Sequence, residues 1–174
     1  MMKSATAATA VLVLGSAAVA VPASFSDEQS ITSTGQSFTF EFTNIPAAIG
    51  SGTLLVEALG DYSIVPPSAE TFGWDIEGIA SGQGFNAGAF ADPDNVDLFQ
   101  NAVSQEFPLT AADLASITAA DTITINAQNS SSVNFFTDQP EDFVRVTISY
   151  DAVPAPGAMG LLGVAGLAAT RRRR

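Results

Sequence analysis

The sequence predicts an all-β protein, an antiparallel β-sandwich of jelly-roll type, flanked by an apolar N-terminal helix and a short apolar C-terminal helix. Two observations predict the sandwich. Residues 24–152 contain roughly seven to nine short segments in which apolar and polar residues alternate, and turn-forming residues separate them every 8 to 12 residues or so. Antiparallel strands that are buried on one face have this pattern, and about 130 residues suffice for one hydrophobic core.

Four segments alternate with the period of two that a half-buried strand requires: 37–43 (SFTFEFT), 70–77 (ETFGWDIE), 122–127 (TITINA) and 143–150 (FVRVTISY). A fifth, 53–59, is more continuously apolar, as expected of a central strand. In the first two segments the alternation divides aromatic from polar side chains. The residues predicted to face the core there are Phe38, Phe40, Phe42, Phe72, Trp74 and Ile76.

Glycine, proline, asparagine and aspartate mark the predicted turns between these strands. They include 60–61 (GD), 81–84 (SGQG) and 129–132 (NSSS). One helix is predicted, at 110–117 (TAADLASI). Its first residue, Thr110, is a suitable N-cap, and an aspartate three residues later is favoured by the helix dipole.

Charge is distributed unevenly along the chain. It has 18 acidic and six basic residues, and five of the six basic residues lie at the ends. The part between the ends therefore carries one cation, Arg145, against 18 acids, a net charge of −17. Such a surface repels phosphate backbones, so nucleic-acid binding is not expected. Arg145 alternates with two valines, so it should point outward and pair with an acid on a neighbouring strand, such as Glu41 or Glu141.

The chain contains no cysteine and no histidine. Disulfides, thiol nucleophiles, cysteine or histidine zinc sites and any catalytic triad with an imidazole base are therefore excluded.

Residues 1–20 are typical of a secretory signal peptide. Lys3 precedes an apolar run, and Ala18 and Ala20 form the small-residue A-x-A pattern that places cleavage before Val21. Residues 21–23 (VPA) offer a second candidate cleavage site three residues on. The alternative, a buried N-terminal helix, is disfavoured because the run shows no amphipathic periodicity.

Residues 153–174 form a second signal-like segment, VPAPGAMGLLGVAGLAATRRRR. The 14 residues after its second proline would make a helix of about 21 Å, against a hydrocarbon layer of about 30 Å, so a membrane span is marginal. The positive-inside rule keeps the arginines in the cytoplasm and the acidic body outside. The residues of this membrane stop are Arg171, Arg172, Arg173 and Arg174.

With the N-terminal signal, this tail resembles the PEP-CTERM sorting signal of bacterial exosortase substrates. Pro154, Ala155 and Pro156 occupy the motif, residues 159–169 the apolar segment and the four arginines its end. Ala155 departs from the glutamate of the motif. The resemblance implies an exosortase-type membrane protease as partner and transient anchoring in the inner membrane. It further implies release or attachment at the cell surface or in the extracellular matrix, in connection with exopolysaccharide or biofilm.

Two acidic groups within the body are candidate sites. Asp92, Asp94 and Asp97 (ADPDNVD) resemble part of a calcium shell, although the spacing does not fit an EF-hand, and a solvated acidic turn is the default interpretation. Asp75 and Glu77 should share one strand face about 7 Å apart. That separation suits a glycosidase pair, but two acids on one exposed face do not flank a sugar from opposite sides.

The resulting prediction is a non-enzymatic exported domain with no required cofactor. The alternatives are a calcium- or carbohydrate-binding module, or a polysaccharide-active enzyme. Aromatic side chains exposed on a strand face would favour the carbohydrate module, but the alternation assigns Phe38, Phe40, Phe42, Phe72 and Trp74 to the core.

Overall fold

The computed structural model describes residues 20–62, 70–85, 89, 100–133 and 141–154. Within these residues the chain forms eight strands, one α-helix and one 3-10 turn. In chain order they are β1 (Val21–Ser30), β2 (Ser37–Thr43), β3 (Ala48–Gly60), β4 (Phe72–Ile76), β5 (Ala80–Gly84), β6 (Asn101–Leu109), α1 (Ala111–Ile117), η2 (Thr118–Ala120), β7 (Thr122–Asn129) and β8 (Phe143–Ala152).

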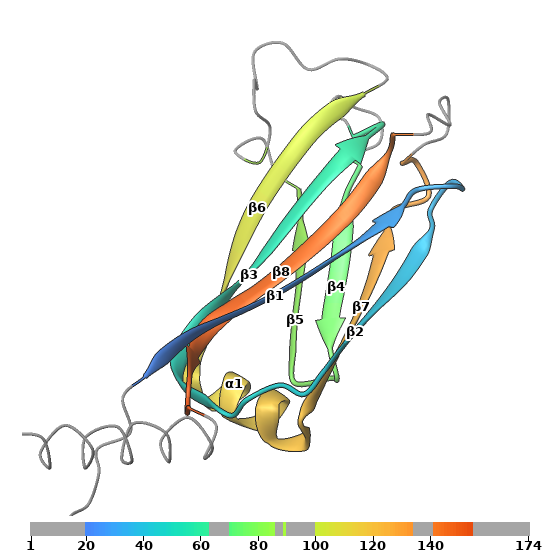
Figure 1. Ribbon diagram of the computed structural model, residues 1–174. Coiled ribbons are helices and arrows are strands. Elements are labelled where there is room, and N and C mark those ends of the chain that lie inside the picture. The colour runs from blue at the N-terminus through green and yellow to red at the C-terminus, as the bar shows by residue number, and fades with distance from the viewer. Residues whose placement is uncertain (1–19, 63–69, 86–88, 90–99, 134–140, 155–174) are drawn as a thin grey trace, which may run out of the picture.

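The strands form two antiparallel sheets of four, with the orders β1-β8-β3-β6 and β2-β7-β4-β5. Figure 1 shows them as two layers, with α1 beneath one end. Of the described strands, only β4 and β5 are neighbours in both chain and sheet, so most of the pairing joins distant segments. The prediction of an antiparallel all-β fold is confirmed.

A single hydrophobic core lies between the two sheets, built from the strand faces that the alternation predicts. Phe38, Phe40 and Phe42 on β2 expose 8% or less of their surface, and Phe72, Trp74 and Ile76 on β4 expose 7% or less. The sheet of β1, β8, β3 and β6 contributes mainly aliphatic residues. They include Leu54, Val56, Val144, Val146 and Ile148.

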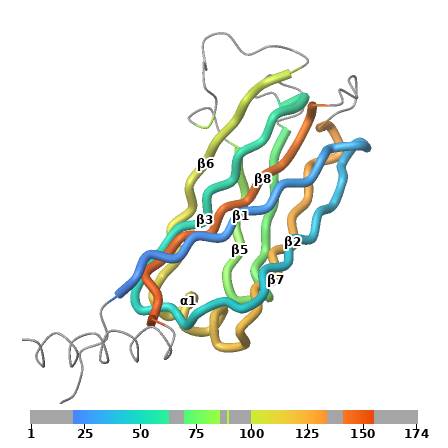
Figure 2. The backbone as a smooth tube through the Cα atoms, viewed as in Figure 1, coloured from blue at the N-terminus to red at the C-terminus, as the bar shows by residue number. Residues whose placement is uncertain are grey.

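Helix α1 covers the open end of the core (Figure 2). It begins as predicted. The Thr110 hydroxyl accepts from the Asp113 backbone N–H at 3.2 Å, and the Asp113 carboxylate accepts from the Thr110 backbone N–H at 3.4 Å, which together form a capping box. Leu114 and Ile117 point from the helix into the core and are fully buried.

The segment predicted as a turn at 81–84 is instead part of a strand, β5. Its glycines are needed for packing: a Cβ on Gly82 would lie 2.7 Å from the Trp74 ring, and one on Gly84 would lie 2.6 Å from the Gln105 side-chain oxygen. The glycines of β5 therefore let the strand pack directly against the Trp74 indole and the Gln105 amide. This requirement is set by the partner strands, so the local sequence does not reveal it.

Arg145 lies on the outer face of β8, as predicted, but its partners were predicted wrongly. Glu28 on β1 and Glu57 on β3 lie directly across from it, and Arg145 Nε donates to Glu28 at 3.0 Å. Glu41 belongs to the other sheet, and Glu141 lies two residues before the start of β8. The cross-strand register, which the alternation leaves open, decides the pairing.

The first and last strands are hydrogen-bonded neighbours. Val21 at the start of β1 pairs with Ala152 at the end of β8, so both ends of the folded body emerge together, near α1 (Figure 1). The predicted terminal helices lie outside the described residues. Among the residues that are described, no helix has the length and apolar character needed to cross a membrane.

A buried polar cluster lies at the other end of the sandwich. Tyr62 is fully buried, and its hydroxyl donates to Asn129 Oδ1 at 2.8 Å, while the Asn101 amide donates to the Tyr62 carbonyl at 2.6 Å. Burial raises the pKa of Tyr62 well above its usual value, and the carboxylates of Asp142 and Glu70 raise it further.

The two tyrosines of the chain, Tyr62 and Tyr150, should make the fold sensitive to alkali. Burial raises the pKa of Tyr150 to about 12, and its hydroxyl donates to the Pro46 carbonyl at 2.9 Å. Because both folded-state values lie above the unfolded value of about 10, the contribution of the two tyrosines to stability should be fully present below pH 10 and decrease as the pH rises from there towards 12. Tyrosinate absorption near 295 nm should appear together with unfolding. Titration at pH 10 with the fold intact would contradict this prediction.

Candidate functional site

The sequence-predicted sites are distributed unevenly over the structure. The calcium candidates Asp92, Asp94 and Asp97 lie outside the described residues, as do most residues of the two terminal signals. Of those signals, the structure describes Ala20, next to the start of β1, and Val153 and Pro154, the two residues after the end of β8. Among the described residues, no group of three acidic, histidine or cysteine side chains is placed to hold a metal ion.

Asp75 and Glu77 do not share a strand face as predicted. Strand β4 ends at Ile76, and Glu77 takes a left-handed conformation with φ of 54° in the turn to β5. Each carboxylate accepts a backbone N–H: Asp75 that of Gly78 at 2.9 Å, and Glu77 that of Thr124 at 2.9 Å. The two acids thus hold the β4–β5 turn against β7.

A groove of about 540 Å³ crosses the outer face of the β2-β7-β4-β5 sheet. We call it the polar groove, because the outward side chains of the four strands that line it are hydroxyls and amides, with one carboxylate. They are Ser37 and Thr39 on β2, Asn126 and Gln128 on β7, Asp75 on β4 and Gln83 on β5, and Gly73 on β4 also lines it.

Strand register arranges the groove residues in two rows across the sheet. The first row runs Ser37, Gln128, Gly73, Gln83. The second runs Thr39, Asn126, Asp75 and continues across the sheet to Ser81, which does not line the groove. With strands about 4.8 Å apart, each row spans about 14 Å. Thr39 Oγ1 donates to Asn126 Oδ1 at 3.1 Å, which joins two strands within the second row.

Gly73 makes the hollow in the first row. It lies between Gln128 and Gln83, and a Cβ placed on it would meet nothing nearer than the Gln128 carbonyl at 3.9 Å. Strand packing therefore leaves room for a side chain here, unlike at Gly82 or Gly84. The missing side chain leaves a depression between two glutamine amides.

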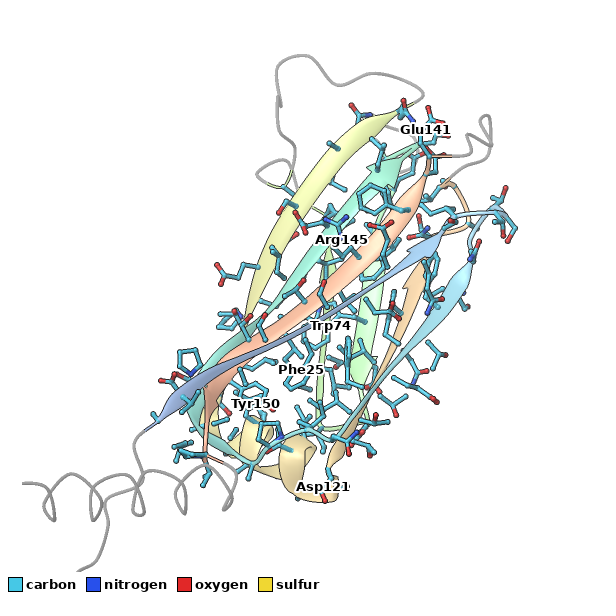
Figure 3. The ribbon with its side chains drawn as sticks, in the orientation of Figure 1. Phe25, Trp74, Asp121, Glu141, Arg145 and Tyr150 are labelled. Atoms are coloured by element: carbon cyan, nitrogen blue, oxygen red, sulfur yellow. The ribbon has the colours of Figure 1, made fainter. Side chains whose placement is uncertain are left out.

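The electrostatics of the groove differ from those of the opposite sheet face. Among the outward residues of the two rows, Asp75 is the one ionisable group. The opposite face carries the Glu28, Arg145 and Glu57 ion pairs, with Arg145 also stacked over Phe143 at 5.1 Å. Figure 3 shows Arg145 on that face, and Trp74 between the two sheets. Amide and hydroxyl groups can both donate and accept, so the groove suits an uncharged ligand with many hydroxyls.

The polar groove was not predicted from the sequence. The alternation correctly turned Asp75 outward but could not show which strands lie beside β4. One local signal was present, which is Gly73 at an outward position of an otherwise regular strand. A glycine in such a position often marks a close approach by a ligand or another backbone.

Comparison with known proteins identifies no relative. The chain matches no protein-family model, and neither a curated protein nor a solved structure is significantly similar to it.

Proposed function

We propose that this chain is an exported, non-enzymatic jelly-roll domain that an exosortase-type membrane protease sorts to the cell surface or the extracellular matrix. The strand order β1-β8-β3-β6 over β2-β7-β4-β5 supports the jelly roll, in which eight strands divide between two sheets. The tail that resembles the PEP-CTERM signal supports the sorting step.

The observation that carries the proposal is the position of the two predicted signals relative to the folded body. The predicted signal-peptide cleavage precedes Val21, which is the first residue of β1. The Pro-x-Pro motif starts at Pro154, just beyond β8, whose last residue is Ala152. Both signals lie outside the strands, so both could be removed without loss of any strand. The paired residues Val21 and Ala152 would then be close to the two ends of the mature chain.

The hydrogen bonds of the two acids considered for catalysis favour a structural role for them instead. Asp75 and Glu77 accept backbone hydrogen bonds that hold the β4–β5 turn. The calcium alternative rests on Asp92, Asp94 and Asp97 and remains a separate hypothesis.

Sorting is tested by replacing Arg171, Arg172, Arg173 and Arg174 with serine in the native host. Without these cations the apolar segment should no longer stop in the membrane, so the variant should keep its tail while the wild type loses it. The matched control is Arg145→Ser, which removes a cation from the folded body and should leave processing unchanged. Tail removal from the serine variant at the wild-type rate would refute the proposal.

A further inference from the structure

We infer that the polar groove binds a neutral polysaccharide chain. The inference concerns the ligand of the domain and relies on the proposed function only for the place where that ligand is met. It starts from the two neighbouring rows of side chains, one of which passes through Gly73 and the other through Asp75.

The lining chemistry identifies the class of ligand. Gln128 and Gln83 flank the hollow at Gly73, and Asn126 and Thr39 adjoin Asp75 in the next row. Each amide offers two N–H donors and a carbonyl acceptor, and a carboxylate is a strong acceptor for a hydroxyl. A chain of sugar rings presents hydroxyls in matching rows, and a span of about 14 Å accommodates a short oligosaccharide segment.

Charge selects among polysaccharides. The body of the protein carries 18 acids against one arginine, and the groove holds a carboxylate and no cation among its described residues. Uronic-acid and sulfated polymers would be repelled, whereas an uncharged chain meets no such barrier. The described lining also lacks an exposed aromatic ring, since Phe38 and Trp74 are buried to more than 90%. Binding of the polysaccharide in the groove should therefore depend on hydrogen bonds, and its affinity should be low.

The single tryptophan offers a direct readout. Trp74 is the one tryptophan of the chain, and it lies beneath the groove, beside Gly82. Occupancy of the groove should change its fluorescence. The full chain, kept in a polyoxyethylene detergent that has no sugar headgroup, is titrated with mixed-linkage β-glucan, glucomannan and dextran, and with alginate as the anionic polymer. Affinity electrophoresis in gels that contain the same polymers provides a second measurement.

Two variants localise the binding. Gly73→Val places a branched side chain in the hollow, and its Cβ would meet nothing nearer than the Gln128 carbonyl at 3.9 Å, so the variant should fold and lose saturable binding. Gln128→Ala removes one amide and should weaken binding about tenfold. The matched control is Ser104→Val, on the exposed face of β6 in the other sheet, which should bind as the wild type does. Circular dichroism melts establish that each variant is folded.

The expected result is saturable binding of at least one neutral polymer and weaker or absent binding of alginate. Gly73→Val should lose the binding of the neutral polymer, and Ser104→Val should keep it. Failure of every neutral polymer to bind, preference for alginate, or unchanged binding by folded Gly73→Val would overturn the inference. Tail processing is measured in a separate experiment, so none of these binding results decides whether the proposed sorting function is correct.

Discussion

Replacing Gly52 with alanine should destabilise the domain by about 3 kcal/mol or more, enough to unfold a marginal protein. Gly52 lies in β3, where that strand passes under α1. A Cβ there would come 2.9 Å from Leu114 Cδ1 and 2.8 Å from Tyr150 Cβ, and would also collide with the backbone carbonyl of Ser149. Neither the backbone of β8 nor a fully buried leucine can move away cheaply.

Other glycines provide controls for this prediction. Gly73→Ala meets only ordinary contacts and should leave stability unchanged or slightly raised. Gly84→Ala meets the end of the Gln105 side chain, which can rotate, so its effect should be intermediate. Urea unfolding followed by circular dichroism ranks the three variants. A Gly52 variant as stable as Gly73→Ala would show that α1 does not pack on β3 as described.

Phe40→Ala should destabilise the fold by about 3–5 kcal/mol, because it empties a large volume at the centre of the core. Phe40 has no exposed surface. Its neighbour Glu41 points outward on the same strand, so Glu41→Ala should change stability by no more than about 0.5 kcal/mol. Equal effects of the two substitutions in urea unfolding would contradict the alternation assigned to β2.

The sequence predicts best those elements whose signals are local. The period of two identifies β2 with its observed bounds, Ser37–Thr43, because three phenylalanines on one face leave one way to bury them. Helix α1 follows from a local cap in the same way. In both cases the residues that decide the structure lie within one segment.

Elements decided by distant partners are predicted poorly. Strand β1 (VPASFSDEQS) is mostly polar and exposed, and it forms through ten backbone register pairs with β8. Strand β5 resembles a turn until Trp74 and Gln105 are seen to occupy the space of its missing side chains.

The candidate site shows the same limit. Asp75 was correctly placed outward, but the groove requires β5 and β7 to lie on either side of β4, with Gln83 and Gln128 level with Gly73. The sequence alone does not establish that register, since local alternation is the same for any choice of neighbours.

The intact mass of the protein recovered from the surface or medium of its native cells tests the central claim most directly. The claim is that an intact domain, β1 to β8, is released from two flanking signals. We expect a chain that begins at Val21 and ends close to Pro156, with every strand retained. A mature chain that still ends at Arg174, or one cut within β1 or β8, would contradict it.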